Sequence, residues 1–423
     1  MADDGVAPVQ IIDELVADTA DGVLGSQSGR FFSWVIGGSV PSAMAADWLT
    51  TVWDQNAGIH ACAPAASVVE EVVADWLKDL FKLPAVCSVG FVTGTQMAHV
   101  TCLAAARHAL LRDRGWNVER QGLAGSPPVR ILVNAERHIS VDRAVRLLGL
   151  GSDSIVPLPV DEMGQVTKET LARALAETSD PTVVVLQAGE LNRASFDNFA
   201  DLAPLARAAG AWTHVDGAFG LWARTSSQYD DLVHGMELCD SWTTDAHKYL
   251  NVPYDSGIAF VRDAAAHRAA LTVSTSYLPP GDSARDELDW NPEFSRRARG
   301  FTIYAALREL GRKGVADIVE RTSRHAQALI SGIGELTGVE VVHRPRFNQG
   351  LLGFLSLETN AEEADHDRRT DEVIAAINGS GGAFFGGVTF NGRRCMRVSV
   401  CNWRTSDADV ARTIDVVRAA LTT

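Results

Sequence analysis

Between about residues 60 and 270, short β-rich runs alternate with amphipathic stretches, and this alternation constrains the fold most strongly. Runs such as 129–135 ("VRILVNA"), 181–189 ("PTVVVLQAG") and 211–217 ("AWTHVDG") are apolar and rich in β-branched residues, which is typical of buried strands. Residues 139–151 and 199–210 have helical spacing and stop at glycine. Strands that alternate with helices predict βαβ units around a mostly parallel sheet, which is an α/β fold.

Before about residue 60 and after about residue 280, strands and helices no longer alternate in this way, which predicts three regions. Residues 1–55 form an N-terminal helical segment that includes "PVQIIDELVAD" and the apolar "PSAMAADWLTTVW". Residues 56–290 form the large α/β domain and end in the polar "PPGDSARDELD". Residues 291–423 form a smaller α+β domain, with a long helical segment from about Glu293 to Leu336, a helix near 371–378, and strands in "GLLGFLSLE" and "RCMRVSVCNW".

Composition excludes several classes of partner. The 423 residues carry a net charge of −15, which argues against a nucleic-acid partner. No stretch is long and apolar enough to span a membrane, and "MADDGVAPVQ" lacks the basic and apolar parts of a signal peptide. The six cysteines are scattered without a CxxC pair, which favours free thiols over disulfides or a metal site. We expect a cytoplasmic protein without a metal.

Three polar elements follow predicted strands or precede predicted helices, where ligands bind in doubly wound sheets. Gly94 and Thr95 stand just before a helix, where the pair either caps the helix or binds a phosphate. Asp216 ends a strand and could be a cap, a metal ligand or the partner of a protonated ring nitrogen. His138 follows another strand and is either structural or catalytic. None of these signals decides the function alone.

Lys248 lies in "TTDAHKYLNVPYDSG", between a histidine and a tyrosine and just before a turn, whereas ordinary lysines are solvated on helix surfaces. A phosphate loop, a histidine, a strand-end aspartate and a semi-buried lysine, in this order, fit pyridoxal 5′-phosphate. Lys248 would form the Schiff base, Asp216 would keep the pyridine nitrogen protonated, and His138 would stack on the ring. Burial would lower the pKa of such a lysine and make its free amine nucleophilic.

The same residues resemble those of the group II pyridoxal-phosphate-dependent amino acid decarboxylases, over most of the chain. "APAASVVEEVVADWL", "FVTGTQMAHVTCLAAAR", "EFSRRARGFTIYAAL" and "MRVSVCNWRTSDADV" resemble family segments. The resemblance implies the aspartate-aminotransferase fold (fold type I), with a seven-stranded, mostly parallel sheet in the large domain. It also implies a homodimer with active sites at the interface. The cofactor-binding residues that it implies are Gly94, Thr95, Gln96, His138, Asp216, Ala218, Asp245, His247 and Lys248.

Three departures from the family pattern bear on the reaction. The phosphate loop reads Thr95-Gln96-Met97-Ala98-His99, which leaves backbone binding intact and changes the side chains. Glu190 replaces a threonine; its carboxylate either lies near the cofactor or pairs with Arg193. The family's loop tyrosine, which would deliver a proton, is replaced by Glu287 on a polar loop, where we expect an ordinary carboxyl pKa.

Substrate recognition is less constrained by the sequence. The residues that we place on the substrate side are Phe31, Trp34, His60, Glu190, Asn192 and Glu287, and they suit an aromatic or medium-sized polar amino acid. We assign structural roles to Arg397 and Arg404, because clamping the α-carboxylate would stabilise the ground state and oppose loss of CO₂.

The leading hypothesis is decarboxylation of an L-amino acid to an amine and CO₂, through a Lys248 Schiff base and a quinonoid. Lys248, His138, Asp216 and His247 are the predicted catalytic residues, with His247 available as a proton donor. The alternatives on the same scaffold are decarboxylative oxidation to an aldehyde and chemistry at Cβ, as in a lyase or aldolase. A non-catalytic paralogue is a remote alternative.

Overall fold

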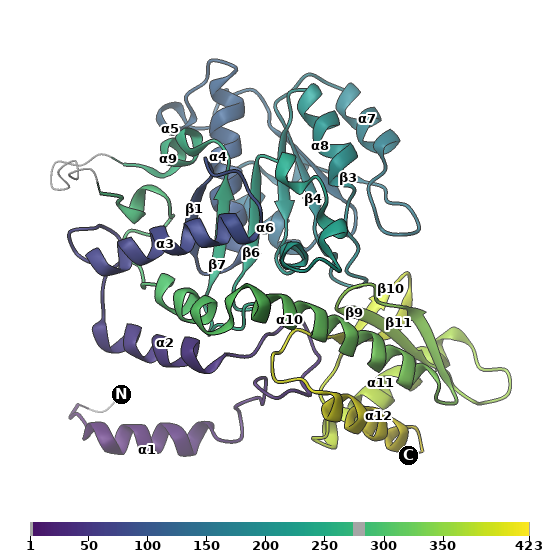
Figure 1. Cartoon of the computed structure of the whole chain (residues 1–423). Coiled ribbons are helices and arrows are strands. Elements are labelled where there is room, and N and C mark those ends of the chain that lie inside the picture. Colours follow the sequence, from purple (N-terminus) through teal and green to yellow (C-terminus); the bar gives the residue numbers. More distant parts are fainter. Residues whose placement is uncertain (1–2, 274–283, 423) are drawn as a thin grey trace.

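The computed structural model describes residues 3–273 and 284–422, and a seven-stranded sheet lies at its centre (Figure 1). Among these strands, β7 runs antiparallel to both of its neighbours, β1 and β6, and the other pairs are parallel. This confirms the expected seven-stranded, mostly parallel sheet. In spatial order the strands are β1 (Ser88–Val92), β7 (Gly257–Val261), β6 (Ser241–Asp245), β5 (Trp212–Asp216), β4 (Thr182–Gln187), β2 (Arg130–Asn134) and β3 (Ile155–Leu158).

Helices cover both faces of this sheet, so its central strands are buried on both sides. In β2, Ile131 and Val133 face one apolar cluster and Leu132 faces the other, as the alternation of side chains along a strand requires. The first cluster is shared with α4 (Thr95–Arg112), α5 (Val118–Gln121), α6 (Ile139–Leu147) and α9 (Ala264–Leu271). The second is shared with α3 (Pro64–Leu80), α7 (Lys168–Ala176), α8 (Phe199–Ala208) and the start of α10 (Gly300–Gly334).

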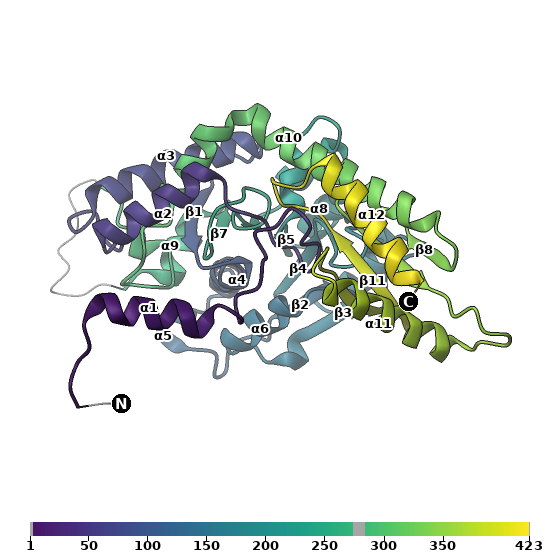
Figure 2. The same ribbon diagram turned by 90° about the horizontal axis from the view of Figure 1, so that it is seen from below.

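The smaller domain is built on a four-stranded antiparallel sheet. Its spatial order is β10 (Gly386–Phe390), β11 (Arg393–Ser399), β9 (Gln349–Phe354) and β8 (Val339–His343). The second half of α10, α11 (Glu363–Gly379) and α12 (Asp407–Leu421) pack against this sheet. Figure 2, seen from below, shows α10 and α12 side by side.

Two expected helix boundaries in this region are wrong. The long helix begins at Gly300 rather than near Glu293, and it is interrupted at Gly311, whose φ of 59° and ψ of −179° are not helical. The helix expected over 371–378 starts earlier, at Glu363, because Glu362 and Asp365 form a capping box at its start. The expected boundaries were drawn from apolar spacing, which does not reveal such caps and breaks.

The N-terminal region contains two helices that differ in their contacts. α2 (Pro41–Trp53) packs against α10, whereas α1 (Pro8–Thr19) has no buried residue and lies apart from the body of the chain in Figure 1. The segment between them joins the small domain, because the backbone N–H of Phe32 donates to the carbonyl of Phe384 at 2.8 Å. The division at residues 55 and 290 stays a prediction. Within the described residues, no helix is both long and apolar enough to cross a membrane.

A buried ion pair links the segment that precedes α10 to α3, which packs on the seven-stranded sheet. Arg296 Nη1 lies 2.8 Å from Glu70 Oε2 on α3, and neither side chain is exposed to solvent. The guanidinium also donates to the carbonyls of Ala57 and Phe91. This connection fixes the position of α3 against the segment that leads into α10.

We predict that Arg296→Met lowers the free energy of unfolding by about 3–5 kcal/mol, because it leaves the buried Glu70 carboxylate without its partner. Denaturant titration measures this loss. Arg312→Met, which breaks the exposed pair with Asp79, is the matched control and should change stability by less than about 1 kcal/mol. A double variant with Glu70→Gln should recover part of the loss; equal losses in the single and double variants would contradict the explanation.

Candidate active site

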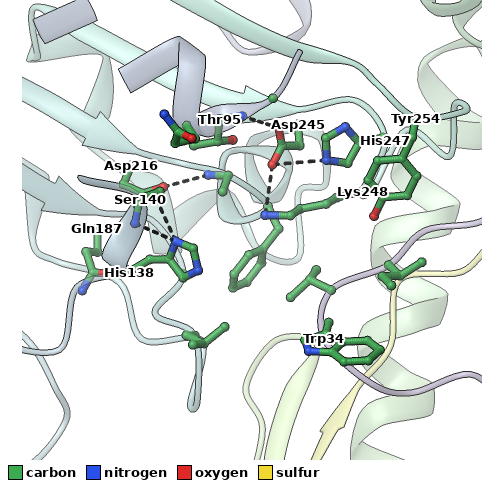
Figure 3. Close-up of a pocket in the computed structure, with 18 of the residues that line it drawn as sticks. Trp34, Thr95, His138, Ser140, Gln187, Asp216, Asp245, His247, Lys248 and Tyr254 are labelled. Atoms are coloured by element: carbon green, nitrogen blue, oxygen red, sulfur yellow. Dashed lines mark hydrogen bonds and ion pairs between the residues drawn. The ribbon is translucent and has the colours of Figure 1, made fainter. Parts of the chain in front are cut away.

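A cavity of about 470 Å³ opens where β4, β5 and β6 end (Figure 3). Because the carboxyl ends of parallel strands meet at one edge, residues far apart in sequence line the same space. The N-terminal ends of α4 and α6, the loop after β6, the segment 34–36 and β11 complete the walls. All nine predicted cofactor-binding residues line this cavity: Gly94, Thr95, Gln96, His138, Asp216, Ala218, Asp245, His247 and Lys248.

Lys248 extends into this cavity from the turn that follows β6. Its Nζ lies 3.0 Å from Asp245 Oδ2 and about 6.0 Å from the centre of the Phe219 ring. Burial opposes ionisation of Asp245, but Lys248 and His247 outweigh burial and hold the pKa of Asp245 below its usual range. The amine is therefore oriented by a carboxylate that stays charged.

Asp216 is the last residue of β5, and its carboxylate is almost completely buried. Oδ2 lies 3.4 Å from Nε2 of His99, and Oδ1 accepts a hydrogen bond from the backbone N–H of Ala218 at 3.3 Å. Burial alone would raise the pKa of Asp216, but His99, His138 and Lys248 hold that pKa well below its usual range. The site thus keeps a negative charge on an almost completely buried side chain.

His138 caps the start of α6 and stands at the cavity wall near Asp216 in Figure 3. Its Nδ1 lies 2.7 Å from Oγ of Ser140 and accepts from the Ser140 backbone N–H at 3.2 Å. Burial is the main cause that lowers the pKa of His138. The ring is therefore neutral at pH 7, which suits a flat stacking surface.

The N-terminus of α4 supplies the anion-binding element. The backbone N–H of Thr95 donates to Asp245 Oδ1 at 2.6 Å, while the buried Thr95 Oγ1 has no protein partner. At Gly257, a Cβ would lie 2.3 Å from Cα of Gly94, so β7 can approach this loop only with glycine there. A free hydroxyl at a helix N-terminus matches a phosphate group.

The predicted substrate-side residues do not all reach the cavity. Trp34 lines it, whereas Phe31 stacks on Phe384 with ring centres 4.9 Å apart and is not part of the lining. His60 and Asn192 are also absent from the lining; the His60 backbone N–H donates to Asp286 Oδ1 at 2.8 Å. These two positions lie outside the cavity of this single chain.

Glu190 is fully buried and faces its own turn. Its Oε1 accepts from the Asn192 backbone N–H at 2.7 Å and its Oε2 from the Arg193 backbone N–H at 2.8 Å. Arg193 Nε is 3.9 Å from Oε2, so the contacts correspond to the alternative in which Glu190 pairs with Arg193. Burial raises the pKa of this carboxyl.

The expectation for Glu287 is wrong in one respect. Instead of a solvated loop carboxylate, Glu287 is 1% exposed on a short helix, Glu287–Asp289, and pairs with Arg285 at 2.8 Å. Burial, with the nearby Glu70, raises its pKa to about 8. The polar composition of the loop concealed this burial. Tyr277 and most of the polar stretch before Ala284 lie outside the described residues.

Several wall residues were not predicted from the sequence as part of the site, among them Gln187, Phe219, Tyr254 and Arg397. Gln187 ends β4, Phe219 follows β5, and Tyr254 stacks on His247 with ring centres 4.2 Å apart. Arg397, assigned a structural role, lines the cavity and donates to the Leu191 carbonyl at 3.3 Å, whereas Arg404 lies over the Trp403 ring. Gln187 could have been assigned to the site from the sequence, because it lies at the end of a predicted strand.

The side chains that line this cavity fit pyridoxal 5′-phosphate. Lys248 offers an amine for the cofactor's carbonyl carbon, and Asp216 offers a buried anion for the ring nitrogen. The unpartnered Thr95 hydroxyl and the start of α4 offer an anion site for the phosphate. Among the described residues, no group of three His, Cys, Asp or Glu side chains is placed to hold a metal ion.

Comparisons with known proteins agree with this fit. The chain is 26% identical to L-2,4-diaminobutyrate decarboxylase of Rhizobium meliloti (strain 1021) over 386 residues, covering 89% of this chain and 74% of that one. It is 24% identical to phenylacetaldehyde synthase of Arabidopsis thaliana over 407 residues, covering 92% and 81%. Among solved structures, Oryza sativa TDC with PLP and tryptamine superposes with a TM-score of 0.92 at 22% identity, covering 100% and 89%.

Residues 5–355 match the pyridoxal-dependent decarboxylase conserved domain. This match includes the lysine, both buried aspartates and the loop before α4. The chain therefore belongs to the pyridoxal-dependent decarboxylase family, with pyridoxal 5′-phosphate as its cofactor and amino acid decarboxylation, a carboxy-lyase reaction, as its activity.

Proposed function

We propose that the enzyme removes CO₂ from an L-amino acid and releases the amine, with Lys248 and Asp216 as the central catalytic residues. The observation that carries this proposal is the placement of a lysine amine and a buried, ionised aspartate in one cavity. When bound, pyridoxal phosphate supplies a ring that takes up the electrons released at Cα. The chain's own residues hold that ring and its charge.

Each residue has a distinct proposed task. Lys248 Nζ holds the cofactor covalently and releases it to the incoming amino group, while Asp245 orients the amine at 3.0 Å. Asp216 keeps the ring nitrogen protonated, because a buried anion stabilises a facing cation strongly. The neutral ring of His138 stacks on the cofactor. His247, beside the lysine, delivers the proton that Cα needs after CO₂ leaves.

The cavity wall supports a substrate with an aromatic or medium-sized side chain. Trp34, Val35 and Ile36 provide an apolar surface opposite Lys248, and Tyr254 adds an aromatic ring. Relatives include an aromatic-L-amino-acid decarboxylase of Bacillus atrophaeus and cysteine sulfinic acid decarboxylases of mammals, so the family accepts both apolar and acidic side chains. The guanidinium of Arg397 at the wall is available to an acidic side chain.

A second outcome is decarboxylative oxidation, in which O₂ is reduced to hydrogen peroxide and the amino acid becomes an aldehyde and ammonia. Two observations favour it. Residues 281–289 contain no tyrosine to protonate Cα quickly, and phenylacetaldehyde synthase is among the relatives. Both outcomes share the loss of CO₂ and differ only in what reaches Cα next.

We expect the purified enzyme with pyridoxal phosphate to release CO₂ from at least one amino acid, and Lys248→Ala to abolish turnover and the visible cofactor band. Amino acids are supplied singly, and CO₂, amine, aldehyde, ammonia and peroxide are followed. Lys82→Ala, at an exposed position, is the control and should behave as wild type. Borohydride-reduced peptides that carry the cofactor on another lysine would refute the role of Lys248.

We expect Asp216→Ala to fold but to lose at least about 10³-fold in kcat, because several kcal/mol of charge stabilisation disappear and each decade corresponds to about 1.4 kcal/mol. Steady-state kinetics at saturating cofactor measure the loss, and circular dichroism checks the fold. Asp415→Ala, at an exposed aspartate on α12, is the control. A variant that keeps more than about a tenth of the rate would exclude the proposed role.

We propose that a second copy of the chain covers the N-terminal helices. α1 exposes Val9, Ile12, Leu15 and Val16, each more than half exposed, and α2 exposes Trp48 and Val52. Exposed apolar side chains on two helices of one segment are typical of a surface that a second copy covers. The dimer that the family resemblance implies would bury it.

The six free thiols support a reducing, cytoplasmic location.

Light scattering should therefore give about twice the 45.4 kDa mass of the chain. Ile12→Asp combined with Val16→Asp should shift the population towards monomer, because charges replace apolar contacts at the interface. Met163→Asp, at an equally exposed position on a distant turn, should leave the mass unchanged. A wild-type enzyme that is monomeric and fully active would contradict the dimer.

A further inference from the structure

Beneath Asp216 lies a connected set of buried polar side chains that the proposed mechanism does not use. His99 Nε2 lies 3.4 Å from Asp216 Oδ2, and His99 Nδ1 lies 2.9 Å from His214 Nε2. His214 Nδ1 lies 2.8 Å from Ser241 Oγ, and the Trp212 indole N–H donates to the same oxygen at 2.9 Å. His99, His214 and Ser241 have no exposed surface.

The fold brings these residues together by simple periodicities. Trp212, His214 and Asp216 alternate along β5 and therefore share one face of the sheet. Ser241 on β6 is paired directly with His214 across the two strands. His99 lies one turn after Thr95 at the start of α4, so the helix that offers the phosphate site also places an imidazole on Asp216.

The chemistry of the donors gives this series of hydrogen bonds a single direction. An indole nitrogen can only donate, so Ser241 Oγ accepts from Trp212. Nδ1 of His214, 2.8 Å away, is the stronger acceptor for the Ser241 hydroxyl hydrogen, because the other one within reach is the sulfur of Cys102, a weak acceptor. A neutral His214 then carries its proton on Nε2 and donates to His99, whose own Nε2–H faces Asp216 Oδ2 at 3.4 Å. Burial lowers the pKa of His214 well below its usual range, which fits a neutral ring.

Neutral donors act differently from a salt bridge at this position. An arginine against Asp216 would cancel much of its charge, whereas an imidazole N–H stabilises the carboxylate and leaves the full negative charge. A chain of hydrogen bonds that all point one way also strengthens its last bond. Oδ2 is held by His99 and Oδ1 by the Ala218 N–H, so the remaining lone pairs can face the cavity.

We propose that His99 and His214 are positioning residues, which form a one-way donor chain from Trp212 through Ser241 that keeps Asp216 ionised and aimed at the ring nitrogen of the bound cofactor. This inference rests on the proposed role of Asp216 and goes beyond it, because it assigns a function to two histidines outside the cavity wall. The sequence feature involved is His99, one of the departures from the family pattern in residues 95–99, which form the start of α4.

The first test uses the protein without cofactor. Nitrogen-15 NMR of labelled histidines at about pH 7 should place both His99 and His214 in the Nε2–H form. Resonances are assigned with His99→Gln and His214→Gln. An Nδ1–H form for either residue would overturn the one-way chain whatever the cofactor does.

The second test follows the nitrogen-15 signal of the cofactor's ring nitrogen and the equilibrium Kd of the cofactor. His99→Phe keeps a ring and removes the donor, so the ring nitrogen should lose its proton at lower pH and Kd should rise about tenfold. His99→Gln, which can still donate an N–H to Asp216, should restore most of both properties. Unchanged values in His99→Phe would refute the proposal.

Matched controls distinguish an effect on Asp216 from a general loss of stability and from a failure of the proposed role of Asp216. His267 is also completely buried, between Ser88 Oγ at 2.8 Å and the Trp290 carbonyl at 3.1 Å, and His267→Phe should reduce stability without changing the ring nitrogen. Asp216→Asn tests the underlying role: if it leaves the ring nitrogen unchanged, the proposed function of Asp216 fails. If His99→Phe does not fold, the first test on the wild-type protein still decides.

Discussion

Two buried carboxylates at the carboxyl edge of the central sheet organise the rest of the site. Asp216 and Asp245 end neighbouring strands, and both remain ionised because histidines, Lys248 and backbone N–H groups surround them. Charge that is removed from water is stable only with such partners. The amine, the start of α4 and the two histidines below Asp216 all take their positions from these two side chains.

The turn after Lys248 connects three segments that are distant in sequence. The side chain of Asn251 accepts from the backbone N–H of Gly38 at 2.6 Å and of Trp403 at 3.0 Å, and donates to the Cys401 carbonyl at 3.0 Å. At Gly37, a Cβ would lie 2.0 Å from the Lys248 carbonyl, so only glycine permits this approach. The lysine is thereby fixed against the N-terminal segment and the small domain at once.

Local patterns predicted the α/β alternation and the residues that gather in the cavity, since the strand ends of a parallel sheet share one edge. The same reasoning failed at Glu287, where a polar loop sequence suggested solvent and the structure has a buried cluster with Arg285 and a raised pKa. Burial depends on what α3 and the Arg296 segment bring from elsewhere in the chain. The composition of the loop carries no information about which segments pack over Glu287.

The order and chemistry of the main groups can be read directly from the sequence: Gly94-Thr95 before a helix, His138 after a strand, Asp216 at a strand end and Lys248 before a turn. Each of these is a local property, because a residue's place in a βαβ unit follows from its immediate neighbours. Tertiary structure alone decided that Tyr254 and Arg397 reach the cavity and that His99 and His214 lie beneath Asp216. Those contacts join separate elements, and their distances and desolvation arise only when the helices pack on the sheet.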